Sequence, residues 1–295
     1  MTAETTNTSK LEIKDNYDLF RIFATKEVKI YIHQSSEDVS NPPSIIYLHT
    51  PTIKELYCND DLVMIFNLLT RNDEKHLKTL KLMFPLKDFN NVAELLLQLY
   101  SYYFVFEEYR FLIKPVDSLF KLIFKTNERE NCDLVLYTDP QDKQAKIAYK
   151  YNLKNDDKHK NYYINITSEI WDYISYILRL SCGEKVTRPI TFSNEMERNF
   201  YLAQQKAESR IQELRQKNNE KMAKTASNQD ILMKAFLSIT YAFPSITFDF
   251  LLDQTMAQIQ WLQQYAAKAM SYQVNAQAAA AGNVKKGFKL KSFLE

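Results

Sequence analysis

The amino-acid sequence predicts an α+β protein: a mixed N-terminal domain of short antiparallel strands and helices, a long charged connector helix and a C-terminal helical module. Before Pro189, alternating or apolar segments are separated by turn-forming residues, which is typical of short strands and helices. Beyond Pro189 the composition favours helices alone. We therefore expect a flexible N-terminus at 1–20, an α+β domain at 21–190, the connector at 191–226, the helical module at 227–284 and a basic tail at 285–295.

Two groups of strands are expected in the N-terminal domain. Glu27–His33 alternates between apolar and polar residues, as a half-buried strand does, and 44–49 supplies its partner. Turn-forming residues separate three further β-rich segments. These segments predict a three-stranded meander at 133–137, 146–151 and 162–166.

Capping residues locate two helix starts in this domain. Thr52 and Glu55 have the spacing of a capping box, in which each side chain accepts the other residue's backbone N–H. Thr167 or Ser168 is placed to cap an amphipathic helix. Gly183 follows that helix at the position where a glycine commonly ends one.

Three more helices are expected between these two. One should occupy about 74–84. Asn90 or Asn91 should cap a long apolar stretch that begins as a helix and stops at Pro115, because proline breaks helix interiors. The second half of this stretch is so aromatic and β-branched that it can be either helix or strand. A short helix should then cover 117–124.

The part of the chain beyond Pro189 is expected to be helical. The segment 194–224 lacks proline and glycine and has acidic residues in its first turn and lysines in its last, which suits a long charged helix. Thr255 and Gln258 form another capping-box pattern, and the helix that it opens can continue to Gly282.

The alanine-rich helix at 256–281 has two interpretations. Its small residues permit close approach of another helix, so it can pair with another chain or with a second copy of itself. Alternatively, one apolar stripe covers the C-terminal helices of the same chain: Ile259, Leu262, Ala266, Ala269 and Met270.

Composition argues against several functional classes. The chain has three glycines, too few and too scattered for a phosphate-binding loop or a nucleophile elbow. Its three cysteines and four histidines are spaced unlike metal ligands, and its paired acidic residues lack a histidine at ligand spacing. We therefore expect no enzyme activity, no cofactor and no metal.

Localisation is predicted from the apolar segments. The apolar runs are shorter than the roughly 20 residues of a membrane span. Residues 1–10 are polar, unlike a secretory signal. We expect a cytoplasmic protein without a membrane partner.

Lysines alternate with tyrosines between Lys143 and Tyr163, a pattern that a nucleic-acid surface can show. The alternative is a solvated hairpin with tyrosines on its packed face. Four aspartates dilute the positive charge here, and the net charge of the chain is +2. We therefore do not expect nucleic-acid binding.

Apolar residues on both sides of Asp253 and Gln254 are the candidate binding site for another polypeptide. A protein that masks a hydrophobic partner needs an apolar surface, and two apolar helices flank this break. The candidate partner-binding residues are Phe250, Leu251, Thr255, Ile259, Trp261 and Leu262.

Three segments resemble the tail assembly chaperones of bacteriophages, which are encoded before the tape measure protein. They are P-T-I-K-E-L at 51–56, Y-Y-I-N-I-T-S-E-I-W-D-Y-I-S-Y-I-L at 162–178 and F-L-L-D-Q-T-M-A-Q-I at 250–259. In the third, Gln254 stands where the family usually has methionine.

The resemblance implies a non-enzymatic protein of the host cytoplasm that binds the tape measure polypeptide and helps to recruit tail tube subunits. It also implies many copies per client and absence from the finished virion. A structural or hub-assembly component of a phage tail or baseplate is the alternative. The two differ in whether the chain is retained in purified particles.

Overall fold

A computed structural model describes residues 12–15, 17, 25–33, 44–57, 59–71, 74–84, 89–103, 110–126, 129–138, 143–153, 161–184, 186 and 228–282. The chain divides into two compact units. One comprises Met1–Thr187 together with Leu252–Gln258, and the other comprises Arg188–Leu251 with Ile259–Glu295. The first boundary lies close to the expected one, but Leu252–Gln258 groups with the N-terminal unit rather than with the helical module. The expected connector and basic tail lie outside the described residues.

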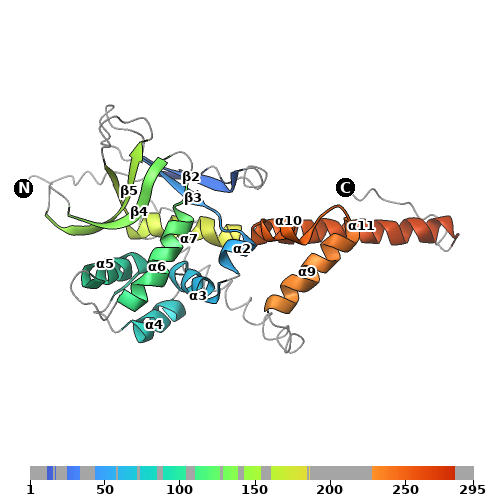
Figure 1. The fold of residues 1–295 in the computed structure, drawn as a ribbon, viewed down its shortest axis with the longest axis horizontal. Helices are drawn as coiled ribbons and strands as arrows, with labels where there is room; N and C mark the ends of the chain where they lie inside the picture. The colour runs from blue at the N-terminus through green and yellow to red at the C-terminus, as the bar shows by residue number, and fades with distance from the viewer. Residues whose placement is uncertain are drawn as a thin grey trace, which may run out of the picture. The chain divides into compact units, whose positions relative to one another are not determined.

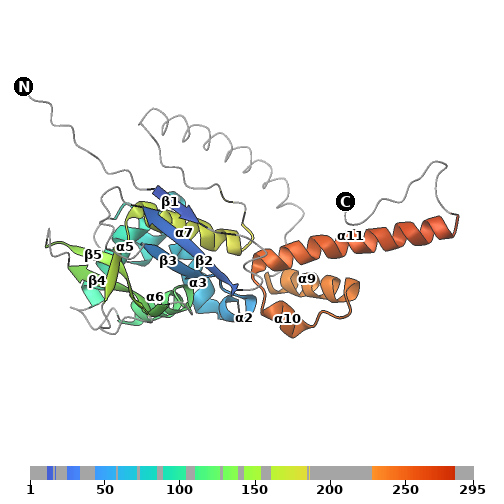
Figure 2. The ribbon, with the colours of Figure 1, turned by 90° about the horizontal axis from the view of Figure 1, so that it is seen from above.

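The first sheet is antiparallel, with the order β1-β2-β3; Figure 1 labels β2 and β3, and Figure 2 also labels β1. Its strands are β1 Glu12–Asp15, β2 Glu27–His33 and β3 Ile45–His49. The pairing of β2 with β3 confirms the expected hairpin. Strand β1 corrects the expected flexible N-terminus: Ile13 pairs with Ile32, and the backbone of this short segment is held by the neighbouring strand.

The second sheet is the expected meander, with the order β4-β5-β6. Its strands are β4 Arg129–Thr138, β5 Ala145–Leu153 and β6 Tyr162–Asn165. Both pairings are antiparallel. Strands β4 and β5 extend beyond the predicted bounds, whereas β6 ends one residue before its predicted end. A register shift between Glu130 and Asp133 interrupts the first pairing.

Beside the two sheets, the described residues of the N-terminal unit form six helices (Figure 2). They are α2 Ile53–Leu56, α3 Asp60–Leu69, α4 Glu74–Met83, α5 Val92–Tyr103, α6 Arg110–Ile123 and α7 Ser168–Ser181.

The expected caps are present. The side chain of Asn91 accepts the Glu94 amide at 2.9 Å, and that of Thr167 accepts the Ile170 amide at 3.3 Å. Gly183 has a φ of +74°, which glycine adopts without strain, and it follows the end of α7 as expected.

Pro115 does not stop a helix, contrary to expectation. It lies inside α6, so the stretch before Pro115 and the short helix expected at 117–124 belong partly to one element. Proline lacks the amide that would complete one bond in the second turn of α6, but its φ is compatible with a helix. Ile113 and Val116 are both buried on the core side, and this packing keeps the helix continuous through the proline.

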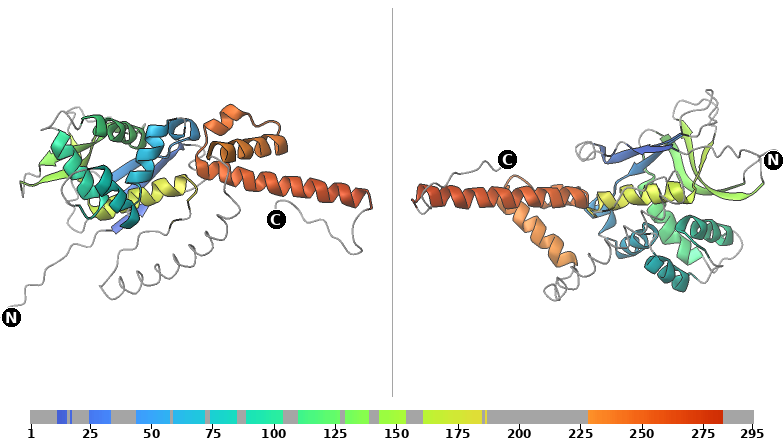
Figure 3. Two further views of the ribbon diagram at one scale, coloured as in Figure 1. Left: turned by 90° about the horizontal axis from the view of Figure 1, so that it is seen from below. Right: turned by 180° about the vertical axis from the view of Figure 1, so that it is seen from behind.

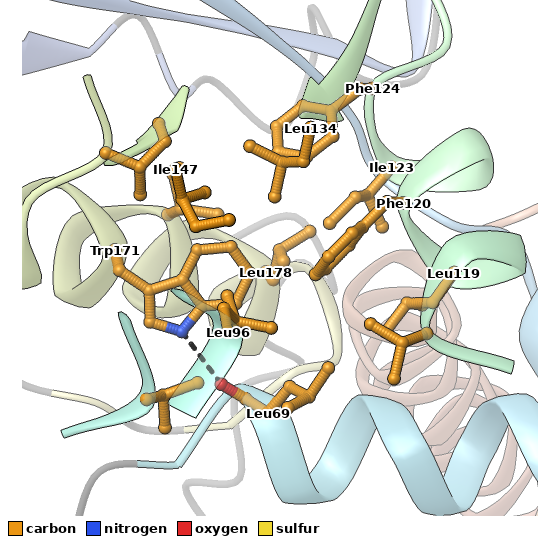
Figure 4. Packing of buried hydrophobic residues seen from close by; sticks show 14 of the residues in the cluster. Leu69, Leu96, Leu119, Phe120, Ile123, Phe124, Leu134, Ile147, Trp171 and Leu178 are labelled. Carbon is orange, nitrogen blue, oxygen red and sulfur yellow. Dashed lines mark hydrogen bonds between the residues drawn. The ribbon is translucent and has the colours of Figure 1, made fainter. Parts of the chain in front are cut away.

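Trp171 of α7 lies at the centre of the N-terminal core (Figure 4). Its indole Nε1 donates a hydrogen bond of 3.0 Å to the carbonyl oxygen of Leu69, at the end of α3. The ring of Phe120 from α6 meets the indole edge-on, with 5.7 Å between centroids. One buried side chain therefore joins three helices, and its polar atom has a partner, as a buried N–H requires.

The described part of the second unit is helical (Figure 3). The C-terminal helices are α9 Asn228–Ala242, α10 Phe248–Leu252 and α11 Met256–Ala280. Gly282, with a φ of +72°, follows the end of α11. The expected helical module is present, with Leu252–Gln258 as the part that groups with the other unit.

Candidate interaction surface on the C-terminal helices

The six candidate partner-binding residues occupy different environments. Leu251, Thr255 and Ile259 are buried, whereas Trp261 and Leu262 are half-buried. Phe250 is 46% exposed. The structure therefore does not bring the six together on one accessible surface, and Phe250 is the member whose side chain a partner can reach most readily.

Thr255 has a structural role at the start of α11. Its backbone N–H donates to the Gln258 side chain at 2.7 Å, and its hydroxyl accepts the Gln258 amide at 3.4 Å. This reciprocal pair is the predicted capping box. Both residues are fully buried, so Thr255 fixes the helix start rather than presenting a hydroxyl to a partner.

The segment around Thr255 also completes the start of α2. The amide of Ile53, the first residue of α2, donates a hydrogen bond of 2.8 Å to the carbonyl oxygen of Gln254. Thr52 caps α2 through the second predicted capping box, in which Glu55 accepts the Thr52 amide at 3.0 Å. Two of the segments that carry the family resemblance, 51–56 and 250–259, are therefore joined through Ile53 and Gln254, which both belong to the N-terminal unit.

A histidine supports the cap at the start of α2. His49 Nε2 lies 2.8 Å from Glu55 Oε2, and both side chains are mostly buried. The hydrogen bond from His49, against the opposing effect of burial, lowers the pKa of Glu55 to about 2. The carboxylate is thus charged where it holds the cap of α2.

Helix α11 buries one apolar stripe. Ile259, Ala266 and Ala269 are buried, and Leu262 and Met270 are half-buried. This pattern is the one expected of a helix that covers other helices of its own chain. Trp261 lies beside this stripe, with its ring centroid 4.4 Å from that of Tyr265. Pairing of α11 with another chain or a second copy stays a prediction.

Helix α9 exposes an apolar stripe that the sequence analysis missed. Met233, Leu237 and Tyr241 follow one another at intervals of four residues, so they lie on one side of the helix. Their exposed fractions are 52%, 54% and 74%. We call these three residues the outer face of α9.

The opposite side of α9 is buried through Ala235, Phe236 and Ile239. The helix is therefore apolar on two sides while one of them faces solvent. A helix that is hydrophobic all round is typically buried all round. The run I-L-M-K-A-F-L-S-I-T-Y at 231–241 carried this signal in the sequence.

Helix α10 adds exposed aromatic side chains. Phe248 is 40% exposed, and its ring meets that of Phe236 edge-on at 5.7 Å between centroids, so α10 lies against α9. We call the exposed apolar side chains of the two helices the α9–α10 surface: Ile231, Met233, Leu237, Tyr241, Phe248 and Phe250.

Charge is scarce around this surface. Residues 228–282 contain five charged residues, whereas charged residues make up 25% of the whole chain. They are Asp230, Lys234, Asp249, Asp253 and Lys268. Depletion of charge combined with exposed Met and aromatic side chains is the composition of the centre of a protein–protein interface.

The described tyrosines of the lysine–tyrosine segment pack against other side chains of the protein. Tyr149 and Tyr151 of β5 are buried. The guanidinium of Arg129 lies over the Tyr151 ring, 3.7 Å from its centroid. Tyr163 is exposed, but its ring already stacks on that of Tyr137 at 4.5 Å. The packed-hairpin interpretation therefore fits the described residues better.

Metal-ligating and thiol side chains were compared among the described residues. They contain no group of three or more His, Cys, Asp or Glu side chains placed to hold a metal ion. Burial raises the pKa of the Cys132 thiol, and it raises that of Cys182 to about 12, which disfavours the reactive thiolate. None of the described helices is both long and apolar enough to cross a membrane.

No protein-family model matches this chain, and comparisons with curated proteins and with solved structures found no significant match.

Proposed function

We propose that this chain is a non-enzymatic assembly factor that binds another polypeptide through the α9–α10 surface. The observation that supports this proposal is the outer face of α9, where Met233, Leu237 and Tyr241 are exposed on a helix whose other side is already packed. Covering such side chains removes apolar area from water, and full burial of one of them is worth about 1.5–3 kcal/mol. A partner with an apolar segment would gain in the same way.

The client is inferred from a resemblance to phage tail assembly chaperones, which is carried by segments 51–56, 162–178 and 250–259. In this proposal the chain binds the tape measure polypeptide in the host cytoplasm, keeps it from aggregating and helps to recruit tail tube subunits. The second and third segments contribute the buried residues Trp171 and Thr255 to the interior of the protein. The α9–α10 surface supplies the contact.

Co-expression tests this proposal. The chain is produced together with a phage tape measure polypeptide, the client that the resemblance implies, and the soluble fraction of that polypeptide is compared with its fraction when it is produced alone. We expect the client to become soluble and to co-purify with the chain. A client that is equally insoluble in both cases, with no co-purification, would overturn the proposal.

A further inference from the structure

Strand β6 has one edge without a partner strand among the described residues, because it lies at the end of the order β4-β5-β6. The Ile166 amide donates to the Ile147 carbonyl oxygen at 2.8 Å, in register with the pairing of β5 and β6. Hydrogen bonding alternates along an antiparallel pair, so Ile164 also bonds to β5, whereas Tyr163 and Asn165 direct their backbone groups away from it. We call the backbone groups of Tyr163 and Asn165 the outer edge of β6.

The other outer strands carry features that hinder the addition of a further strand. Strand β1 is charged, with the sequence E-I-K-D. At the edge of β3, Arg129 donates a hydrogen bond of 2.5 Å to the carbonyl oxygen of Ile45. Strand β4 has an irregular register between Glu130 and Asp133. Charges, covering groups and bulges are the means by which proteins keep a sheet edge from pairing.

Strand β6 has none of these features within its described residues. Its sequence, Y-Y-I-N, contains no charge and no proline, and its pairing with β5 keeps one register from Tyr162 to Asn165. Tyrosine and isoleucine favour strands. Such an edge accepts an extended segment, since a strand supplies a row of N–H and C=O groups at matching spacing.

A second copy of β6 matches this edge. Antiparallel pairing about a two-fold axis at Ile164 sets Tyr163 opposite Asn165 of the second copy, and the symmetry repeats this pair. Each pair exchanges N–H···O bonds in both directions, so every backbone group of the outer edge gains a partner. The two strands have the same short length and no charge, so no like-charge repulsion opposes their pairing.

The side chain of Tyr163 adds an apolar contact to this pairing. It is 41% exposed, and its ring stacks on that of Tyr137 with 4.5 Å between centroids. In the symmetric pairing, the Tyr163 side chains of the two copies are diagonal neighbours, within reach of aromatic rings. The stacked tyrosines then continue from one copy to the next, and the exposed part of Tyr163 is buried.

We infer that the outer edge of β6 pairs with β6 of a second copy of this chain, antiparallel about a two-fold axis at Ile164. The two sheets of order β4-β5-β6 then form one continuous sheet across the dimer. This inference goes beyond the proposed function and concerns a different part of the chain from the α9–α10 surface.

Sedimentation of the full chain over a range of concentrations tests the inference, and we expect a reversible dimer. Tyr163→Lys places two lysines diagonally across the axis and should raise the dissociation constant of the dimer about tenfold. Tyr137→Lys is the matched control. It removes the same ring stack but adds no charge to β6, so its dissociation constant should stay within about twofold of the wild-type value. Circular dichroism checks that both variants fold.

Hydrogen–deuterium exchange resolved to single amides locates the pairing. The amides of Tyr163 and Asn165 should exchange more slowly at a concentration where the dimer forms than after dilution. The amide of Ile164, which bonds to β5, should exchange equally slowly in both samples and is the internal control. A dimer in which the Tyr163 and Asn165 amides exchange as fast as in the monomer would contradict the inference.

The sedimentation results can also overturn it. A chain that stays monomeric up to about 0.1 mM does not form this dimer at a useful affinity. Equal weakening by Tyr163→Lys and Tyr137→Lys would show that charge at the outer edge has no effect. A dimer that survives Tyr163→Lys but is lost in Val274→Glu, at an exposed site of α11, would assign self-association to that helix. No client enters these measurements, so their outcome is independent of the proposed function.

Discussion

The backbone amide of Ile53 donates a hydrogen bond of 2.8 Å to the carbonyl oxygen of Gln254, and so joins the start of α2 to a segment far along the chain. The first amides of a helix have no partner inside it. Here Gln254 supplies one of those partners, and Leu252–Gln258 belongs to the N-terminal unit as a result. The N-terminal domain is therefore not complete at residue 190, where the sequence places its end.

We predict that a fragment of residues 1–190 is less stable than the same unit in the full chain. It loses the acceptor for the Ile53 amide and the buried side chains of Thr255 and Gln258. We expect a loss of about 1–3 kcal/mol, the penalty for an unsatisfied buried donor. A peptide of residues 248–262 that carries Trp261→Phe, and so adds no second tryptophan, should recover part of this loss when it is added to the fragment.

Tryptophan fluorescence measures this effect. The chain has two tryptophans, so Trp261→Phe leaves Trp171 in the N-terminal core as the reporter of urea unfolding in the full chain. A peptide of residues 263–277 serves as the control for nonspecific binding. If the fragment and the full chain unfold at the same urea concentration, the contact between Ile53 and the segment around Gln254 does not contribute to stability.

Glu55 should make stability depend on pH in acid. Its pKa is lowered from 4.5 to about 2 in the folded protein, so the unfolded chain takes up the proton first as the pH falls. The stabilisation is complete above pH 4.5 and is lost as the pH falls through about 2. Since the side chain is partly exposed, we expect about 1–2 kcal/mol.

The substitution Glu55→Gln measures the contribution of this carboxylate to the pH dependence of stability. Glu55→Gln keeps an acceptor for the Thr52 amide but loses the charge beside His49, so its stability should fall less steeply between about pH 5 and pH 2. Glu169→Gln, at an exposed site in the first turn of α7, is the matched control. Chemical unfolding over this pH range gives the slopes, and identical slopes for Glu55→Gln and the wild type would contradict the prediction.

Substitution by aspartate should change the stability little on the outer face of α9 and lower it strongly on the buried side. Leu237 is 54% exposed and Ile239 is fully buried, two residues further along the helix. Leu237→Asp should change stability by no more than about 0.5 kcal/mol, whereas Ile239→Asp should cost about 3 kcal/mol or more because it buries a charge. Thermal unfolding followed by circular dichroism compares the pair. A large loss of stability in Leu237→Asp would show that the outer face is covered within the chain.

Substitutions of two predicted partner-binding residues, Phe250 and Ile259, distinguish an effect on binding from an effect on folding. Phe250 is 46% exposed, so Phe250→Asp should weaken client binding while leaving the helix content unchanged. Ile259 is buried, so Ile259→Asp should unfold the C-terminal helices and lose binding for that reason. Pull-down and circular dichroism on the same samples measure both effects. Full binding by Phe250→Asp would remove α10 from the proposed surface.

Local signals in the sequence identified most elements of the fold. The alternation in Glu27–His33, the β-rich segments of the meander and the capping boxes at Thr52 and Thr255 act over a few residues, and each formed as expected. Strand β1 was missed because its four residues carry too short a pattern, and its pairing with β2 is what holds it. The helix through Pro115 was missed because packing of Ile113 and Val116 outweighs one lost hydrogen bond.

The candidate site was less predictable. Apolar residues around Asp253 indicated an interaction surface, but a sequence does not show which of two apolar helix faces is buried. Leu251 and Ile259 are covered, and the exposed stripe lies on α9 instead. Thr255 matched the family resemblance and a capping box together, and its burial assigns it to the cap.

The central claim is that this chain is a chaperone that binds a client polypeptide during assembly. Two quantities test it most directly: the number of copies of the chain in the complex, and whether the chain is retained in mature particles. The chain is co-expressed with a phage tape measure polypeptide, the complex is measured by size-exclusion light scattering, and mature particles are searched for the chain by mass spectrometry. The account predicts a soluble complex with several copies per client and no chain in the particles. Absence of a complex, together with the chain in purified particles, would contradict it and support a structural component of the tail or baseplate.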